Sequence, residues 1–315
     1  MSDWRPTAPI AALRRRAEIL SSIRAFFAAR GVLEVETPLL SAATVTDVHL
    51  HSLAATTADG GRRYLQTSPE FHMKRLLAAG SGPIFQLGRA VRDGESGRRH
   101  NLEFTMLEWY RPGFDHHRLM NEVDELLGAI LGTPHAERLT YRGAFLRHAG
   151  VDPFAAPIEE LRSAVLRSGV ADPGLDDRDG LLSLLVGAVV EPRLGRGRPS
   201  FLYDYPASQA ALARIRPGDP PVAERFEVYV DGVELANGFH ELADAAEQRA
   251  RFEADLADRR RSGLEEPPVD ERLLAALAAG LPDCAGVALG VDRLVMIALG
   301  AADIAEVIAF PADRA

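Results

Sequence analysis

The chain has 315 residues, a formal net charge of −9 and a single cysteine, Cys284. One cysteine excludes an internal disulfide and a cysteine-based zinc site, and the acidic balance argues weakly against binding nucleic acid mainly through phosphate contacts. No apolar run approaches the roughly 18 residues of a membrane span. The first residues, MSDWRPTAPIAALRRR, lack the apolar centre of a signal peptide. We therefore expect a cytoplasmic protein.

The first expected element is a helix from Ile10 to Phe27, where apolar residues recur at helical spacing and Gly31 suits the end. The segment VLEVETP then alternates like a strand and ends at Pro38. Two or three strands, with a short helix after the letters TSPE, are expected between residues 62 and 110.

The second half of the chain mixes the two kinds of element. Strands and helices without regular βαβ alternation predict an α+β fold built on an antiparallel sheet flanked by helices. The expected elements are a helix over 119–131, helical patches with breaker-rich loops over 133–222, a hairpin over 224–241, a charged helix over 244–262, and a strand, turn and helix over 286–300.

The hairpin is the most specific local signal. Asp231-Gly232 between two alternating runs is typical of a two-residue hairpin turn. Counting back from that turn pairs Val230 with Val233 and Tyr229 with Glu234. Asn237-Gly238 is expected to mark a bend farther along the second strand.

This register places Glu227 diagonal to Glu234 on one face of the hairpin. Two bare carboxylates there would repel each other. A divalent cation would remove that repulsion, and Mg²⁺ typically takes one or two carboxylates plus substrate phosphates. Glu241 extends the acidic series, and the alternative interpretation is a solvated polar face.

A cationic loop, RDGESGRRH (92–100), precedes a strand-like run that carries aromatic and acidic residues. Arginine forks suit phosphate oxygens. On the strand, Phe104, Glu108 and Tyr110 share one face by period two. An aromatic ring beside an arginine can stack on a base, and an acid with a phenol can receive an ammonium. The alternative is a polar sheet edge.

The third segment, GVALGVDRLVMIALG (286–300), places Asp292 and Arg293 at the start of an apolar helix. An arginine at a helix start works against the helix dipole, so it is easier to understand if it faces an anion. Structural glycine turns are common, so this segment alone is a weak signal. Together, the three segments predict a pocket for a nucleoside triphosphate, a metal and a cationic small molecule.

These segments resemble the three signature motifs of class II aminoacyl-tRNA synthetases of the lysyl type. The helix and strand that end at Pro38 resemble motif 1, the dimer element; FQLGRAVRDGESGRRHNLEFTMLEWY (85–110) resembles motif 2, and residues 286–300 resemble motif 3. Lysyl-tRNA synthetases carry an N-terminal anticodon-reading domain, whereas motif 1 here starts almost at once. With TSPEFHMKRLL, ELANGFHEL and LGAADIAEVIAFPADRA, the chain closely resembles the elongation factor P–(R)-β-lysine ligases, which are truncated paralogues of those synthetases.

The resemblance implies a function. We expect residues 1–315 to form a single class II catalytic domain without an anticodon-binding domain, acting as a homodimer through motif 1. The family uses ATP and Mg²⁺ to activate (R)-β-lysine as an adenylate and passes it to a lysine of elongation factor P. The alternatives are activation of lysine, transfer to tRNA or another amine, and a regulator that binds ligand without chemistry.

The resemblance also implies site residues, with Arg92 and Arg293 as the catalytic cations. The residues expected at the amino acid are Ser68, Glu70, Glu108, Tyr110, Asn237 and Glu241. The residues expected at ATP are Arg92, Asp93, Glu95, His100, Asn101, Phe104, Glu234, Leu235, Gly290 and Arg293. Glu227 and Glu234 would hold Mg²⁺.

One part of motif 2 departs from the family pattern. The loop usually reads Arg-Asn-Glu-Glu, and its first glutamate helps to recognise adenine. Here the residues are Arg92-Asp93-Gly94-Glu95, and Leu102 replaces a usual proline. Because glycine permits backbone rearrangement, we expect Glu95 to move inward and take over the adenine contact.

Overall fold

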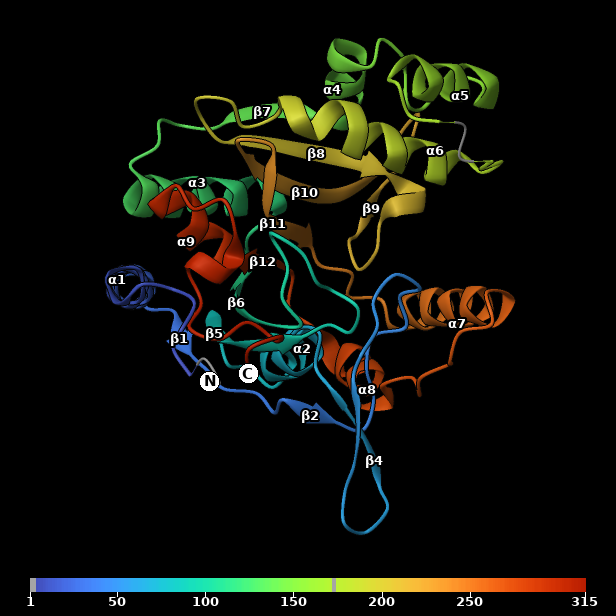
Figure 1. Ribbon diagram of the computed structural model, residues 1–315. Helices are drawn as coiled ribbons and strands as arrows, with labels where there is room; N and C mark the ends of the chain where they lie inside the picture. Colours follow the sequence, from blue (N-terminus) through green and yellow to red (C-terminus); the bar gives the residue numbers. More distant parts are fainter. Residues whose placement is uncertain (1–3, 172–173) are drawn as a thin grey trace. The chain divides into compact units, whose positions relative to one another are not determined.

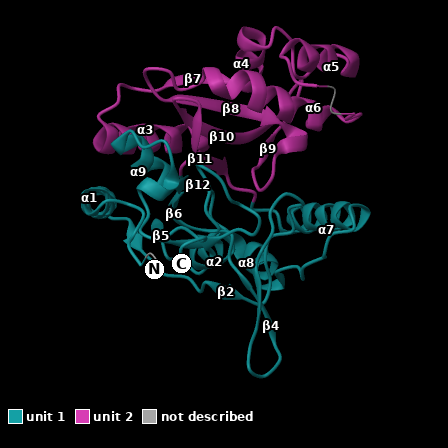
Figure 2. Ribbon diagram, in the orientation of Figure 1, with its two compact units in different colours: residues 1–113, 243–284, 288–315 teal, residues 114–242, 285–287 magenta. Residues whose placement is uncertain are grey.

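The computed structural model describes residues 4–171 and 174–315. These residues form two compact units (Figure 2). Unit 1 contains the chain up to Gly113 together with 243–284 and 288–315, and unit 2 contains 114–242 and 285–287. Strand β12 (Cys284–Gly290) contributes residues to both units.

Unit 1 holds the segments that resemble motifs 1 and 2 and the helix of motif 3. Its helices are α1 (Ile10–Ala28), α2 (Glu70–Ala78), α7 (Ala245–Arg261), α8 (Glu271–Gly280) and α9 (Val291–Leu299), with a 3₁₀ turn at Ile304–Glu306. Its strands are β1 (Leu33–Glu34), β2 (Leu40–Ser41), β3 (Ala54–Thr56), β4 (Arg62–Leu65), β5 (Ile84–Val91) and β6 (Glu103–Pro112).

Strands β5 and β6 are the framework of unit 1. They pair antiparallel without interruption from Ile84 opposite Tyr110 to Val91 opposite Glu103. The short strand β1 adds to β5 in parallel, and β2, β4 and β3 form a separate antiparallel sheet. The connection between β5 and β6 is the cationic loop, so the long hairpin carries that loop at its end.

Helix α1 forms where the apolar spacing predicted it. Its buried residues, which include Ile19, Ile23 and Phe27, recur at helical spacing on one face. The Phe27 ring stacks on Phe85 of β5 at a centroid distance of 4.6 Å and meets Trp109 of β6 edge-on at 5.2 Å. The helix is therefore fixed to both strands of the hairpin by aromatic contacts.

Unit 2 contains the long segment for which the sequence predicted only helical patches and loops. Its helices are α3 (His116–Leu131), α4 (Tyr141–His148), α5 (Ile158–Arg167) and α6 (Arg178–Leu185), followed by a π-helical turn at Val186–Val190 and 3₁₀ turns at Glu191–Arg193 and Ala207–Gln209. Its strands are β7 (Glu137–Thr140), β8 (Ser200–Pro206), β9 (Ile215–Arg216), β10 (Val222–Val230) and β11 (Val233–His240).

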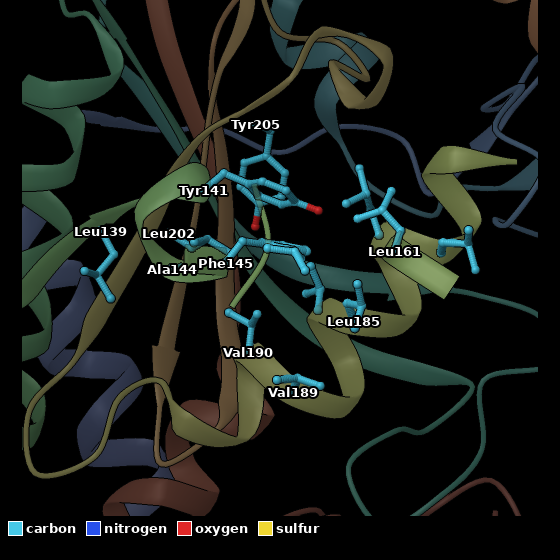
Figure 3. Packing of buried hydrophobic residues seen from close by; sticks show 14 of the residues in the cluster. Leu139, Tyr141, Ala144, Phe145, Leu161, Leu185, Val189, Val190, Leu202 and Tyr205 are labelled. Carbon is cyan, nitrogen blue, oxygen red and sulfur yellow. The ribbon is translucent and has the colours of Figure 1, made fainter. Parts of the chain in front are cut away.

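The strands of unit 2 are mostly antiparallel. Strand β10 pairs antiparallel with β8, β9 and β11, and β7 pairs parallel with β8. Helices α4, α5 and α6 gather beside β8 (Figure 1). Their apolar faces and the strands enclose a core in which the Tyr141 and Tyr205 rings lie 4.9 Å apart (Figure 3).

The predicted hairpin is confirmed at its turn. Asp231 and Gly232 both have positive φ, at 50° and 72°, as a type I′ turn requires. Val230 pairs with Val233 and Tyr229 with Glu234, as counted from the sequence. The register then shifts, because Val228 pairs with Ala236 and leaves Leu235 as an extra residue.

The α+β prediction with an antiparallel sheet is confirmed, since helices and largely antiparallel strands make up both units. The strand predicted to run up to Pro38 is shorter than expected, because it pairs as a strand only at Leu33–Glu34. Over the described ranges, no helix combines the length and apolar character needed to cross a membrane.

Candidate active site

The loop between β5 and β6 in unit 1 is tied down at both ends. The backbone N–H of Arg92 donates to the carbonyl of Leu102 at 3.0 Å, and that of Asp93 donates to the carbonyl of His51 at 2.8 Å. Gly94 has φ of +77°, a conformation that favours glycine. A glutamate would be strained in this backbone conformation, so the glycine permits a loop path that the usual residue would not favour.

Arg92 lies beside the aromatic ring that was expected to stack on adenine. Its guanidinium carbon is 5.2 Å from the centroid of Phe104. Its Nε donates to the carbonyl of Thr67 at 3.3 Å, and its Nη1 is 3.5 Å from Glu95 Oε1. These contacts are long, and a guanidinium has five N–H donors. Arg92 can therefore take phosphate oxygens without first giving up a strong partner.

Glu95, the acidic residue that follows Gly94 in the loop, points toward Arg92. Its carboxylate lies toward the loop base, and it also raises the pKa of His100 against the larger opposing effects of burial and Arg293. The expected contact between Glu95 and adenine remains a prediction.

His100 meets the arginine of motif 3. Its Nε2 lies 2.6 Å from Arg293 Nη2, and Arg293 Nε donates to the carbonyl of Arg99 at 3.5 Å. Partial burial and the Arg293 charge lower the pKa of His100. The ring is therefore neutral near pH 7 and accepts from the guanidinium, so the loop and the start of α9 bring their basic groups together.

Asn101 has a different surrounding from the other expected ATP residues. It is buried, its Nδ2 donates to the carbonyl of Glu103 at 2.7 Å, and its Oδ1 accepts from the N–H of Ala312 at 2.9 Å. Both ends of the amide are used by the backbone. Asn101 thus holds the loop against the C-terminal segment, and its direct contact with ATP stays a prediction.

Asp292 was noted in the sequence at the start of an apolar helix, but its role as a positioning residue was not predicted. It is buried at the start of α9, accepts from the N–H of Thr105 at 2.8 Å, and lies 2.6 Å from Arg16 Nη1. Arg16 also donates to the Thr105 hydroxyl at 2.8 Å. This network fixes α1, β6 and α9 to one another and so positions Arg293 in the first turn of α9. Gly290 is the N-cap residue of that helix. The charged residue in an apolar helix start was the available signal.

The expected amino-acid residues of unit 1 form one hydrogen-bonded group. Glu108 is 2% exposed, and its two oxygens accept from Ser68 Oγ at 2.8 Å and from the Tyr110 hydroxyl at 2.6 Å. Tyr110 is buried beside it. The structure thus brings together Ser68, just before α2, with Glu108 and Tyr110 of β6, as the resemblance required.

Glu70 joins this group through Ser68. Its backbone N–H donates to Ser68 Oγ at 3.0 Å, while its side chain accepts from Lys74 Nζ at 2.7 Å. Lys74 is 1% exposed and was not singled out in the sequence. A lysine four residues after an acid on one helix is the signal that could have found it, because such residues share a face.

Glu227 of unit 2 is held by three donors. Arg225 Nη2 donates to Oε1 at 2.5 Å, the Tyr205 hydroxyl donates to Oε2 at 2.6 Å, and the Tyr229 hydroxyl also donates to Oε2. Burial and the Glu227 charge raise the pKa of both tyrosines, so they remain protonated donors. Burial alone would lower the pKa of Arg225, but Glu227 beside it raises that pKa. The carboxylate is therefore held in place by three donors before any ligand binds.

Two expectations about this carboxylate were wrong. Glu227 is not bare, because Arg225 two residues earlier balances its charge. The extra residue Leu235 also places Glu227 opposite Asn237 and not opposite Ala236, so the register counted from the turn holds only for its first two pairs. A bulge of this kind depends on packing across the sheet and not on the turn.

The two carboxylates still fit a magnesium ion. Both Glu227 and Glu234 raise the pKa of Tyr229, and Glu234 pairs directly with that residue across the hairpin. A carboxylate offers about four lone-pair sites, so Glu227 can accept a further ligand beside its present donors. Glu234 is only half-buried. The charge of this set suits a hard cation that retains phosphate or water ligands.

The remaining expected residues lie on β11 or just after it. Asn237 Oδ1 accepts from Arg225 Nε at 3.3 Å, and Glu241 is 1% exposed and bridges to Ala213. The expected bend at Gly238 was wrong: this residue pairs with Phe226 within the strand. A Cβ there would collide with the Phe226 ring, so close packing explains the glycine.

The side chains of Leu235 and Asp93 give no support for a direct contact with ATP. The Leu235 side chain is buried, which leaves its backbone for ATP. Asp93 accepts from the N–H of Gly94 at 2.9 Å. Both assignments remain predictions.

Comparison with known proteins shows the family to which the chain belongs. The family model described as tRNA synthetases class II (D, K and N) matches residues 2–314. The chain belongs to this family. The predicted resemblance of the chain to class II synthetases is thereby confirmed.

Curated relatives of this class II chain match over its full length. A protein of Edwardsiella ictaluri is 59% identical over 323 residues, one of Vibrio cholerae 58% over 321, and one of Salmonella typhi 58% over 322. Each alignment covers 100% of this chain and 99% of the relative. All three relatives are named elongation factor P–(R)-β-lysine ligase.

Proposed function

We propose that this class II chain is an ATP-dependent ligase that activates (R)-β-lysine as an adenylate and transfers it to a lysine side chain of elongation factor P. The observation that carries the proposal is the 57–59% identity, over essentially the whole of both chains, to relatives named for this activity. Hydrogen bonds to the expected site residues support the proposal. In unit 1, Glu108 accepts from Ser68 and Tyr110, and in unit 2, Glu227 accepts from Arg225 and Tyr205.

In the first step, a carboxylate oxygen of the amino acid attacks the α-phosphorus of ATP. The bond from that phosphorus to the bridging oxygen breaks, and pyrophosphate leaves with the electron pair. Negative charge builds on the phosphoryl oxygens, so preorganised cations lower the barrier. Arg92 serves the α-phosphate in this proposal, and Arg293, with its Nε and Nη2 directed at the loop by Arg99 and His100, serves the nucleotide.

Phe104 supplies the stacking surface for adenine beside Arg92. Glu227 and Glu234 would hold Mg²⁺, which when bound neutralises phosphate charge. Arg225 and two tyrosines orient Glu227 for this task. Because these donors are in place beforehand, little reorganisation is needed when ATP arrives.

The ammonium groups of β-lysine are assigned to buried acids. Glu108, with Tyr110 and Ser68 on its two oxygens, is oriented as an acceptor in unit 1, and Glu241 is the buried acid of unit 2. Glu70 and Asn237 complete the expected set. A buried carboxylate is a strong partner for an ammonium because water screens their attraction less.

In the second step, a lysine amine of elongation factor P attacks the carbonyl carbon of the adenylate. The bond to the phosphate oxygen breaks, AMP leaves, and the nitrogen gives up its proton to solvent. A homodimer belongs to the same proposal, supported by the exposed apolar side chains of Ile10, Leu33 and Leu40 in and near the motif-1 segment. So does a cytoplasmic location, with which a sequence containing one cysteine is consistent.

The test is ATP–pyrophosphate exchange with (R)-β-lysine and with lysine as separate substrates. The proposal predicts exchange that depends on amino acid and is faster with (R)-β-lysine. A chain that binds these ligands but exchanges no pyrophosphate would be a regulator, and preference for lysine would remove β-lysine as the substrate.

A further inference from the structure

Unit 2 contains a second cluster of ionisable side chains that the proposed reaction does not use. His116 begins α3, Glu224 lies on β10 and His240 ends β11. One ligand atom from each of these three side chains lies within 4.8 Å of the others. Along β11, His240 points to the opposite face from Asn237, because side chains alternate along a strand. The cluster is therefore distinct from the Glu227 network.

The imidazole of His116 is the unusual member. The residue is 1% exposed, yet neither ring nitrogen has a hydrogen-bond partner among the described residues. Leaving a buried polar group without a partner costs about 1–3 kcal/mol. Its Nε2 lies 3.7 Å from Asp204 Oδ1, a buried oxygen that likewise makes no hydrogen bond within the described chain. Two unpartnered groups thus face each other across a gap.

Arg216 orients the two carboxylates from outside. Its Nη2 lies 2.7 Å from Asp204 Oδ2, and its Nη1 lies 3.3 Å from Glu224 Oε1. The other oxygens are left for the histidines: Asp204 Oδ1 faces His116, and Glu224 Oε2 is 2.6 Å from His240 Nδ1. Outer partners that hold ligating carboxylates in this way are typical of metal sites.

We propose that His116, Glu224 and His240, with Asp204 as fourth ligand, bind a Zn²⁺ ion. Two imidazoles with carboxylates suit zinc, whereas Mg²⁺ prefers oxygen ligands alone. Metal–ligand bonds of about 2.0–2.2 Å require small movements, in which the His240–Glu224 contact opens and the gap at His116 closes. Four protein ligands make a closed site, so the ion is structural and joins the start of α3 to β8, β10 and β11.

A cavity adjoins Asp204, the proposed fourth ligand. This cavity of about 280 Å³ in unit 2 is lined by ten residues that include Asp204 and Arg216. Arg216 is 40% exposed, so its side chain can move aside without unfolding the strands. The competing explanation is a metal-free network, in which a proton on the histidines and the Arg216 charge balance the two acids.

The experiment measures Zn²⁺ binding by the full-length chain without a histidine tag, after treatment with a chelator. Excess Mg²⁺ is present throughout, so that the proposed Mg²⁺ residues are saturated. We expect one tight equivalent of Zn²⁺ and a higher melting temperature, because an ion that binds only the folded state stabilises it. With Co²⁺ in place of Zn²⁺, we expect the intense visible absorption of a tetrahedral site.

The matched pair of variants is His116→Gln and His117→Gln, since His117 is the exposed neighbour on the same helix turn. His116→Gln should weaken Zn²⁺ binding by more than the roughly 10–100-fold that removal of an outer partner costs, and His117→Gln should leave it unchanged. Asp204→Asn gives a second test if His116→Gln does not fold. Equal Zn²⁺ affinity in the original chain and both ligand variants, or no Zn²⁺ binding at all, would overturn the proposal. ATP–pyrophosphate exchange is not a readout, so the result is independent of the proposed function.

Discussion

Arg92 in unit 1 and Glu227 in unit 2 are both charged groups assigned to ATP activation, but they are held differently. Arg92 is half-buried and makes contacts of 3.3 Å and 3.5 Å. Glu227 is 8% exposed and accepts three hydrogen bonds, two of them at 2.5 Å and 2.6 Å. The difference indicates that the cation is available for an incoming phosphate, whereas the carboxylate is part of the folded framework as well as the site.

Replacing Glu227 should give the largest effect, and it should be on stability as well as activity. Glu227→Gln leaves Arg225, whose side chain is 18% exposed, without its charged partner, which costs on the order of 3 kcal/mol of unfolding free energy. Urea denaturation measures this. The control is Glu247→Gln, which breaks an ion pair with Arg251 on the exposed side of α7 and should cost less than about 1 kcal/mol. If the two variants were equally stable, Glu227 would not be part of the folded framework, and the contrast with Arg92 would fail.

Replacing Arg92 should affect chemistry alone. Arg92→Ala removes a cation assigned to the α-phosphate, and removal of one such donor typically lowers the rate about 10²–10³-fold. The melting temperature should stay close to that of the original chain because the hydrogen bond to Thr67 and the ion pair with Glu95 are both long and weak. Arg89→Ala is the control: Arg89 lies on β5 three residues before Arg92, is 53% exposed, and pairs only loosely with Glu103 at 3.5 Å. If both variants exchange pyrophosphate at the normal rate, Arg92 is not the catalytic cation.

The two glutamates of the hairpin can be separated by their magnesium dependence. Glu234 is half-buried, so Glu234→Gln should leave the fold intact while raising the Mg²⁺ concentration needed for half-maximal exchange by roughly tenfold, or about 1.4 kcal/mol. Amino-acid binding should change much less. An unaltered Mg²⁺ titration would contradict the metal assignment.

The smallest effect is expected at His100. Because burial and Arg293 lower its pKa, the unfolded chain takes up a proton at a higher pH than the folded chain does. The associated stability is present above the ordinary histidine pKa of about 6.5 and disappears as the pH falls toward the lower folded value. His100→Gln should therefore lose less stability than the original chain between pH 7 and pH 5. Parallel melting curves over that range would count against the contact with Arg293.

The hairpin of β10 and β11 shows which features could be predicted from the sequence and which could not. Asp231 and Gly232 predicted its turn and first two pairs because both residues favour positive φ, a local property. The bulge at Leu235 was missed because it reflects packing of the whole sheet. Arg225, the partner of Glu227, was within reach, since residues two apart on a strand share a face.

The site shows the same division. Motif residues such as Arg92, Phe104 and Arg293 were predicted from short sequence patterns and from the family resemblance. The networks around them were not, because Asp292 meets Arg16 across more than 270 residues of sequence, a separation that no local pattern encodes. His116, Asp204, Glu224 and His240 come from four separate elements, and a single ionisable residue in each gives no signal by itself.

The most direct test of the proposed function is the identity of the acyl acceptor. The purified chain is incubated with ATP, Mg²⁺ and (R)-β-lysine, together with elongation factor P or with bulk tRNA, and both products are weighed by mass spectrometry. The proposal predicts that elongation factor P gains the mass of one β-lysyl group on a lysine side chain, while tRNA stays unchanged. A charged tRNA beside an unmodified elongation factor P would contradict it.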